Sequence, residues 1–180
     1  MILHSTIEVR RANRNRVFRY LYEATEPVTK QDLAYALSMS LPTLTQNLNE
    51  LLEEGLIDNS ETADSSGGRK PRILTVVPGA RYAVGVELSS NHIRLVALDL
   101  QVREVGFRVV QRPFRADREY ADRLARTMEA LLDETGVPRE KLLGVGITVP
   151  GIVDGDQASL TGAYTLGIPQ RDIGALVGAI

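Results

Sequence analysis

The 180-residue chain contains no cysteine, which excludes disulfide bonds and thiolate metal sites within these residues and is typical of a reducing compartment. It has no apolar run near the roughly 18 residues that span a bilayer, and its beginning, MILHSTIEVRR, lacks the apolar core of a signal peptide. The formal net charge is only −2, so overall charge does not draw the chain to a polyanion. We therefore expect a cytoplasmic protein without a membrane segment, in which any contact with nucleic acid comes from a local arrangement.

The composition is that of a folded protein. With 43% hydrophobic and 24% charged residues, the chain can bury a packed core, and its length suits one large domain or two small ones. Pro78 and Gly79 interrupt the pattern after a β-branched stretch. We expect a boundary there, with one domain at residues 1–77 and a second at residues 78–180.

Residues 8–25 have the spacing of an amphipathic helix. Four residues at i, i+3, i+4 and i+7 share one face, namely Val17, Tyr20, Leu21 and Ala24. Five cations surround that face, namely Arg10, Arg11, Arg14, Arg16 and Arg19. Such cations either form a solvated surface or lie near phosphate groups, and this segment alone leaves both interpretations open.

Two further helices are predicted next, separated by a short turn. Thr29 can cap the first of them, with Asp32 three residues later as the acidic partner of a capping box. Ser40 is a second candidate N-cap, and Pro42 falls in the first turn of the following helix, where its missing N–H costs little. The predicted apolar stripe of this helix is Leu41, Leu44, Leu48, Leu51 and Leu52. A short helix, a turn and a longer helix make a helix-turn-helix.

The second helix of this pair has a polar face suited to reading bases. Gln and Asn side chains can pair with adenine, and a Thr methyl group can contact the thymine methyl in the major groove. The candidates for DNA contact are Ser40, Pro42, Thr43, Thr45, Gln46 and Asn47. The alternative is an ordinary helical hairpin with polar solvent-facing residues. Four acids, Glu50, Glu53, Glu54 and Asp58, are expected to point away from DNA.

A wing follows the helices. Gly55 can end the helix, Leu56 and Ile57 begin an extended stretch, and RILTVV reads as a returning strand. Between the strands lies SSGGRKP, where glycines permit a close approach and the proline keeps its neighbour extended. Arg69 and Lys70 are therefore candidates for the minor groove or for phosphates, and a plain basic linker is the alternative.

The second part predicts three strands, a helix and a further strand. The strands are expected at Tyr82–Leu88, Ile93–Leu98 and Glu104–Val110, the helix ends at Gly136, and the last strand, predicted to be buried, covers Leu142–Val149. This order is that of the first part of a ribonuclease H-like lobe, as in actin and sugar kinases. The predicted fold class is thus α+β, a winged helix-turn-helix followed by a partial α/β lobe.

The order of a winged helix, GGRKP, YAVGVELSSNHIRLVALDL and GVGITVPGIVD resembles the ROK family of repressors, open reading frames and kinases. The resemblance extends from about Asn13 to Leu176 and is closer to the repressor branch. Kinases of the family carry Asp-x-Gly-Gly-Thr around the ATP phosphates, and here the matching stretch from Glu87 to Asn91 reads ELSSN. Both glycines and the threonine are missing, so the resemblance implies no ATP site and no catalytic residue.

The resemblance also implies a sugar pocket. Pro150 and Gly151 match a turn beside the sugar, and Tyr164 lies near a further contact, although core packing is as good an interpretation of Tyr164. The family's sugar-binding Asn-Asp pair and its Cys/His zinc site would lie beyond Ile180. We expect a truncated effector domain, with no metal and no cofactor in this segment.

The predicted function is a DNA-binding transcriptional regulator, a repressor of carbohydrate genes that responds to a sugar or sugar phosphate. It would act as a homodimer or higher oligomer on a palindromic, AT-rich operator. The alternative is a ROK-type sugar kinase with an accessory DNA-binding head, and a third interpretation is a winged helix that binds protein.

Overall fold

The computed structural model describes residues 2–62, 71–115, 117–154, 159–162, 166 and 171–172. The chain divides into two compact units, Met1–Ala80 and Arg81–Ile180, so the division falls three residues after the predicted boundary. Helices and a mixed sheet together confirm the α+β class. None of the helices in the described ranges is both long enough and apolar enough to cross a membrane.

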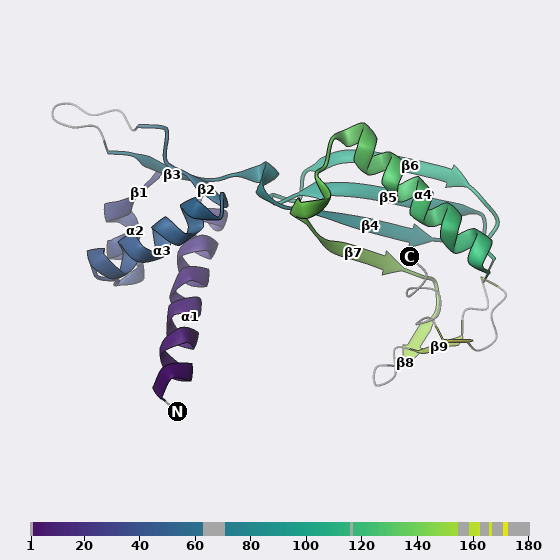
Figure 1. Ribbon diagram of the computed structural model, residues 1–180, viewed down its shortest axis with the longest axis horizontal. Coiled ribbons are helices and arrows are strands. Elements are labelled where there is room, and N and C mark those ends of the chain that lie inside the picture. Colours follow the sequence, from purple (N-terminus) through teal and green to yellow (C-terminus); the bar gives the residue numbers. More distant parts are fainter. Residues whose placement is uncertain are drawn as a thin grey trace. The chain divides into compact units, whose positions relative to one another are not determined.

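The first unit combines three helices with a small antiparallel sheet (Figure 1). Its elements are α1 (Ile2–Glu23), β1 (Val28–Thr29), α2 (Lys30–Leu37), α3 (Leu41–Glu53), β2 (Ile57–Asp58) and β3 (Ile73–Val76). β3 is the central strand and pairs antiparallel with β1 on one side and β2 on the other. The two-residue β1 was not predicted, because two residues carry no measurable alternation.

The predicted caps of α2 and α3 are confirmed. The Thr29 side chain accepts from the Asp32 backbone N–H, and the Asp32 carboxylate accepts from the Thr29 N–H at 2.8 Å. Ser40 caps α3 with its side chain, and Gly55 adopts a left-handed φ of 66° just after that helix. Ser38 also takes a left-handed conformation, which turns the chain between α2 and α3. The turn is therefore fixed by local chemistry on both sides.

The core of the first unit joins all three helices to β3. Its fully buried side chains include Val17 of α1, Leu33 of α2 and Leu44 of α3, each with no exposed surface. Leu41 was predicted to share this core, and that prediction is wrong, since 51% of the residue is exposed. Leu41 opens the helix ahead of the first buried turn, beyond the reach of α1 and β3.

The second unit is a four-stranded sheet with one long helix on it. Its main elements are β4 (Tyr82–Leu88), β5 (His92–Asp99), β6 (Glu104–Gln111), α4 (Arg118–Thr135) and β7 (Leu142–Thr148). The strand order is β6-β5-β4-β7, with β7 parallel to β4 and the other pairs antiparallel. Shorter strands follow at β8 (Ile152–Asp154), β9 (Ser159–Gly162) and β10 (Arg171–Asp172), and a single helical turn lies at Arg139–Lys141. A helical turn at Pro78–Ala80 ends the first unit.

α4 covers one face of this sheet (Figure 1). Every second residue of β4, from Val84 to Leu88, points into a core formed with Leu124 and Leu132 of the helix. The helix begins at the Asp117 cap and ends at Gly136, whose φ is 66°. The predicted strands at Tyr82–Leu88 and Leu142–Val149, and the predicted stop at Gly136, are confirmed to within one residue. The prediction that the last strand is buried is wrong, because β7 is an edge strand and 66% of Leu143 is exposed.

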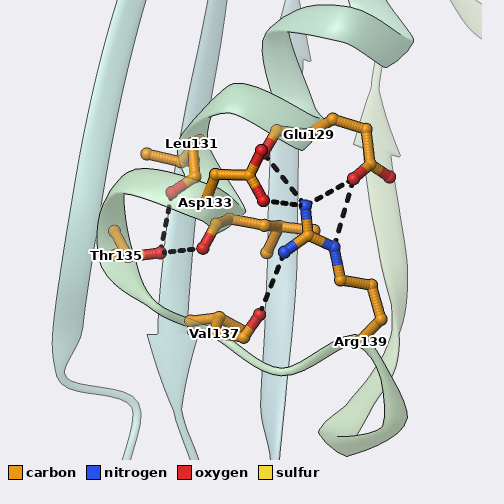
Figure 2. Close-up of polar contacts among 7 residues, drawn as sticks. Glu129, Leu131, Asp133, Thr135, Val137 and Arg139 are labelled. Carbon is orange, nitrogen blue, oxygen red and sulfur yellow. Dashed lines mark hydrogen bonds and ion pairs between the residues drawn. The ribbon is translucent and has the colours of Figure 1, made fainter.

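Arg139 links the end of α4 to the segment that follows it. Arg139 is hydrogen-bonded to the carboxylates of Glu129 and Asp133, to the Glu129 carbonyl at 3.2 Å and to the Val137 carbonyl at 3.5 Å. Figure 2 shows the guanidinium lying between the two carboxylates. Together these contacts hold the turn that leads from α4 into β7.

Candidate nucleic-acid interface

α3 buries one stripe and exposes the opposite one. Leu44, Leu48 and Leu51 are at most 4% exposed and face the core of the first unit. The outward stripe runs through Pro42, Gln46, Asn49 and Glu53, which follow one another at helical spacing and are not buried. Three of these four residues carry no charge, so the outward surface is polar and neutral over the first two turns.

Asn47 does not belong to this outward surface. Asn47 is only 3% exposed, and its Nδ2 donates to the Thr43 carbonyl at 2.7 Å. Its Oδ1 is buried without a hydrogen-bond partner among the described residues. The prediction that Asn47 contacts bases is therefore wrong for this conformation, because position 47 is rotated toward the core side of α3.

Asn49 is the amide that the prediction missed. It lies seven residues after Pro42 and three after Gln46, on the exposed stripe. The signal was present in the sequence, since residues three, four and seven apart share a helical face. An outward pair of amides at 46 and 49 can reach base edges, whereas the predicted pair at 46 and 47 points in two directions.

The start of α3 presents hydroxyl groups. Ser40 and Thr43 share a hydrogen bond between their side-chain oxygens at 2.9 Å, and the Thr43 N–H donates to the Ser40 Oγ at 3.4 Å. Both residues are exposed. Apart from this mutual contact and the cap, no hydrogen bond holds the two hydroxyls to the rest of the described structure, so they can turn toward a ligand.

Thr45 is bound more tightly. Its hydroxyl donates to the Leu41 carbonyl, one turn earlier, and accepts from the Nζ of Lys30 at the start of α2. Lys30 was not among the predicted site residues. The contact ties the two helices of the pair together beside the outward stripe of α3 and brings a cation to its edge.

Two acids, one in the last turn of α3 and one just after the helix, are paired with arginines of α1. Arg10 donates from its Nε to the Glu50 carboxylate at 2.7 Å, and Arg14 forms an ion pair with Glu54. The arginines that could have faced phosphates are thus partly used to hold α1 against α3. Their pairing also removes two negative charges from the flank of the candidate interface.

Glu53 does not follow this pattern. It lies seven residues after Gln46 on the same stripe, about 10 Å further along the helix, and is exposed. The prediction that all four acids point away from the candidate interface is therefore wrong for Glu53. A groove that receives the first turns of α3 has to leave the last turn outside.

The segment between β2 and β3 begins and ends at paired residues. Thr62 and Arg72 form an isolated antiparallel bridge, and the Ile73 N–H donates to the Glu61 carbonyl at 2.9 Å. Arg72 also donates to the Asn59 side chain at 3.3 Å. Arg69 and Lys70 lie outside the described residues, so their predicted contacts stay predictions.

In the second unit, the predicted ligand residues follow β7. Pro150 and Gly151 follow β7 after Val149, at the edge of the sheet where the parallel strand β4 also ends. Gly151 is exposed and Pro150 is half-buried. Tyr164 lies outside the described residues. No group of His, Asp and Glu residues that could hold a metal ion occurs in the described ranges.

Residues 87–91, which match the phosphate loop of ROK kinases, lead into a turn held by hydrogen bonds between Ser89 and His92. The Ser89 N–H donates to the His92 carbonyl at 2.9 Å, and the His92 N–H donates to the Ser89 Oγ at 3.1 Å. Glu87 pairs across the strands with Arg94 at 2.8 Å. This is a tight turn between β4 and β5 with a surface ion pair beside it.

Comparison with known proteins gives a consistent group of relatives. The xylose repressor of Bacillus subtilis is 27% identical over 138 residues, which cover 73% of this chain and 34% of that protein. The transcriptional dual regulator NagC of Escherichia coli K12 is 23% identical over 154 residues, covering 84% of this chain and 37% of that protein. No family model matches the chain.

A solved structure extends the comparison to the fold. The crystal structure of a ROK family transcriptional regulator, a homologue of the Escherichia coli MLC protein, superposes with a TM-score of 0.68. The superposition covers 95% of this chain and 43% of that one, at 17% identity. In sequence and in fold, the chain resembles ROK transcriptional regulators. The chain spans about a third of the length of the curated relatives it matches.

The likeness in fold covers the first unit as well as the second. Because the superposition covers nearly all of this chain, the arrangement of α1, α2, α3 and the small sheet is shared with a protein described as a transcriptional regulator. At this level of identity the structural likeness concerns the fold, and the roles of individual side chains have to be argued from their own geometry.

Proposed function

We propose that residues 1–77 are a winged helix-turn-helix that binds double-stranded DNA, and that the chain acts as the DNA-binding part of a transcriptional repressor. The observation that carries this proposal is the outward face of α3, which is neutral and polar over its first two turns while the acids beside it are paired with α1. A helix that only covers a core gains nothing from keeping this surface free of charge.

In the proposed complex, the N-terminal half of α3 enters the major groove. Gln46 and Asn49 supply amides for base edges, and Thr43 supplies a hydroxyl at the start of the helix. Ser40 and Pro42 lie at the helix N-terminus, where backbone N–H groups favour a phosphate. Arg69 and Lys70 extend the contact into the adjacent minor groove, with two copies of the chain on a palindromic, AT-rich operator.

The second unit is proposed as the beginning of a ribonuclease H-like sensor for a sugar or sugar phosphate. Two relatives carry xylose and N-acetylglucosamine repressor names, which indicate the class of effector. Pro150 and Gly151 are proposed as one wall of that pocket, with Tyr164 as a further contact and without a metal or cofactor in this segment. The protein is proposed to be cytoplasmic and not an enzyme.

A sugar kinase is the weaker proposal. Backbone N–H groups cradle phosphates best where glycines allow a close approach. In this chain the corresponding backbone is engaged in the Ser89–His92 turn. ATP turnover by the 180-residue chain in the presence of xylose, glucose or N-acetylglucosamine would reverse this ranking.

The decisive experiment measures DNA affinity as a function of salt. Sequences enriched from a random DNA library by the 180-residue chain should bind with a steep negative slope of log affinity against log salt, because phosphate contacts release counterions. Gln46→Ala should weaken binding about tenfold, whereas Gln101→Ala, an exposed glutamine in the second unit, should leave it unchanged. Absence of any enriched sequence would overturn the proposal.

Arg69 allows the wing to be tested separately. If Arg69 enters the minor groove, Arg69→Ala should weaken binding more when the flanks of the enriched site are A·T-rich than when they are G·C-rich, because the narrow A·T minor groove concentrates negative potential. An equal loss on both kinds of flank would reduce Arg69 to a phosphate contact.

A further inference from the structure

The two threonines at the start of α3 differ in what their hydroxyl groups can still do. A threonine hydroxyl has one hydrogen to donate and two lone pairs that accept. In Thr45 the hydrogen is directed to the Leu41 carbonyl, and one lone pair accepts from Lys30 Nζ. In Thr43 the hydroxyl contacts only Ser40, whose own hydroxyl can serve as the donor.

The hydrogen bonds of Thr45 occupy its hydroxyl, so its γ-methyl group is the part left for an external partner. The hydroxyl cannot donate to a base unless it gives up the Leu41 carbonyl, and its orientation is fixed from two sides. The γ-methyl group, in contrast, makes no hydrogen bond and is carried by a residue that is only half-buried. Two contacts on the oxygen also restrict rotation about χ1, so the methyl group is held in one position.

The place of Thr45 along the helix matches the region that enters a groove. It is the fifth residue of α3, one residue before Gln46 and one turn after the N-terminus. Recognition helices contact base edges with their N-terminal residues. Among the four base pairs, only those containing thymine present a methyl group in the major groove.

We propose that Thr45 is a specificity-determining residue that selects thymine through contact between its γ-methyl group and the thymine 5-methyl group. This inference rests on the proposed DNA-binding function. Lys30 is the positioning residue, because it holds the Thr45 oxygen and thereby sets the direction of the methyl group. Thr43 has the complementary role, with a hydroxyl free to hydrogen-bond a base or phosphate.

The test replaces thymines by uracil, which removes only the 5-methyl group and keeps every hydrogen-bonding edge. In a site enriched by the 180-residue chain, each thymine is replaced in turn and the affinity is measured. We expect a position in each half-site where uracil weakens binding about fourfold, the value of one buried methyl group.

Three variants then assign that position to Thr45. Thr45→Ser keeps the hydroxyl and both of its bonds but lacks the methyl group, so it should bind the thymine site about fourfold less tightly and should no longer distinguish uracil from thymine. Thr45→Val keeps a methyl group but loses both contacts on the oxygen that set its direction, so it should discriminate less well than the unaltered chain does. Thr43→Ser is the matched control, and it should discriminate as well as the unaltered chain does.

A second measurement distinguishes recognition of the thymine methyl group from stabilisation of the helix pair α2 and α3. If the Lys30–Thr45 contact serves only stability, Lys30→Met should lower the melting temperature and leave the uracil effect intact. If Lys30 positions the methyl group, Lys30→Met should reduce the discrimination between uracil and thymine, whatever its effect on melting.

The outcomes are distinct from those that concern the proposed function. A chain that enriches a specific site in which no thymine is sensitive to uracil overturns the inference on Thr45 and keeps the DNA-binding function. Persistence of the uracil effect in Thr45→Ser also overturns it. Failure to enrich any sequence overturns the function and the inference together.

Discussion

α3 and α4 are built alike on their inner sides and differently on their outer sides. Each begins at a side-chain cap, Ser40 or Asp117, and each buries a stripe dominated by leucine. The outward residues of α4 are almost all charged, namely Arg118, Glu119, Asp122, Arg123, Arg126, Glu129, Asp133 and Glu134. The outward residues of α3 are mainly uncharged.

The charges of the two helices are also used differently. Acids at both ends of α4 are paired within the second unit, Glu119 with Arg112 and Glu134 with Arg108. On α3 the paired acids lie on the flank that faces α1, and the outward stripe stays free of ion pairs among the described residues. The difference is that α4 carries charges over its whole outward face, whereas the outward stripe of α3 is neutral over its first two turns.

The largest expected effect on stability comes from truncating a buried leucine in the core of either unit. Leu44→Ala and Leu124→Ala each remove a fully buried side chain, and each should lower the free energy of unfolding by about 2–5 kcal/mol. Because the chain divides into two units, we expect the loss to be confined to the unit that carries the substitution. Hydrogen exchange measured for peptides of each unit in rising urea tests this.

Leu41→Ala is the matched control for that experiment, since half of this leucine is already exposed. It should change the free energy of unfolding by much less than Leu44→Ala does. Equal loss of protection in both units after either core substitution would show that the two cores unfold as one.

The next effect tests the outward face of α3 directly. Gln46→Glu places a carboxylate at the centre of the neutral stripe, where it repels phosphates and cannot donate to a base. We expect DNA affinity to fall at least tenfold. Gln101→Glu adds the same charge at an exposed site of the second unit and should leave affinity within about twofold, as fluorescence anisotropy would show.

A smaller effect is a loss of stability at alkaline pH that we expect in the second unit, through Tyr120. Burial raises the pKa of Tyr120 to about 12, although the nearby Arg112 opposes the shift. Because the folded pKa lies above the unfolded value of 10.0, the stabilisation is fully present below pH 10 and is lost as pH rises toward 12. By pH 11 the loss should be about 1 kcal/mol.

Tyr120→Phe should remove this alkaline loss from the second unit. The Tyr120 hydroxyl is buried without a partner among the described residues, so its deletion should cost little at neutral pH. Tyr35→Phe is the control, because 91% of Tyr35 is exposed. Urea titrations at pH 8 and pH 11 measure both, and an unchanged alkaline slope in Tyr120→Phe would contradict the assignment.

The smallest expected effect concerns the capping box of α2. Hydrogen bonds from the Thr29 side chain and backbone N–H hold the pKa of Asp32 below its usual value. The contribution is therefore present above about pH 4 and is lost as pH falls through the lowered folded pKa. Asp32→Asn should cost a few tenths of a kcal/mol at pH 6, and the difference should vanish near pH 2.

Asp122→Asn provides the comparison on α4, as it removes an exposed carboxylate outside any capping box. Urea titrations of both variants at pH 6 and pH 2 measure the difference. A cost for Asp32→Asn that is equal at the two pH values would indicate lost helix propensity and not a lost carboxylate.

Much of the local structure could be predicted because its causes are local. Thr29 and Asp32 are three residues apart and bond to each other, and Ser40 caps the helix that starts at the next residue. The strands of the second unit alternate strongly enough that β4 was predicted at its observed bounds. Glycines at 55 and 136 take the left-handed conformations that end their helices.

The candidate site was predicted in kind but not in every residue. The spacing of the leucines indicates the stripe of α3 that is buried, but it leaves open how far that buried surface extends to each side. Asn47 lies at the margin of the stripe, and the packing of the unit turned it inward, while Asn49 remained outside. A rotation of a fraction of a turn decides which amide is available.

The sequence by itself determined where α2, α3 and β4 begin and where α3 and α4 end, because caps, glycines and alternation act between neighbouring residues. Only the tertiary structure decided which charges are cancelled and which hydroxyls are engaged. Glu50 meets Arg10 across forty residues, and Thr45 meets Lys30 across fifteen. Such contacts depend on how the helices pack, so no pattern within one segment can reveal them.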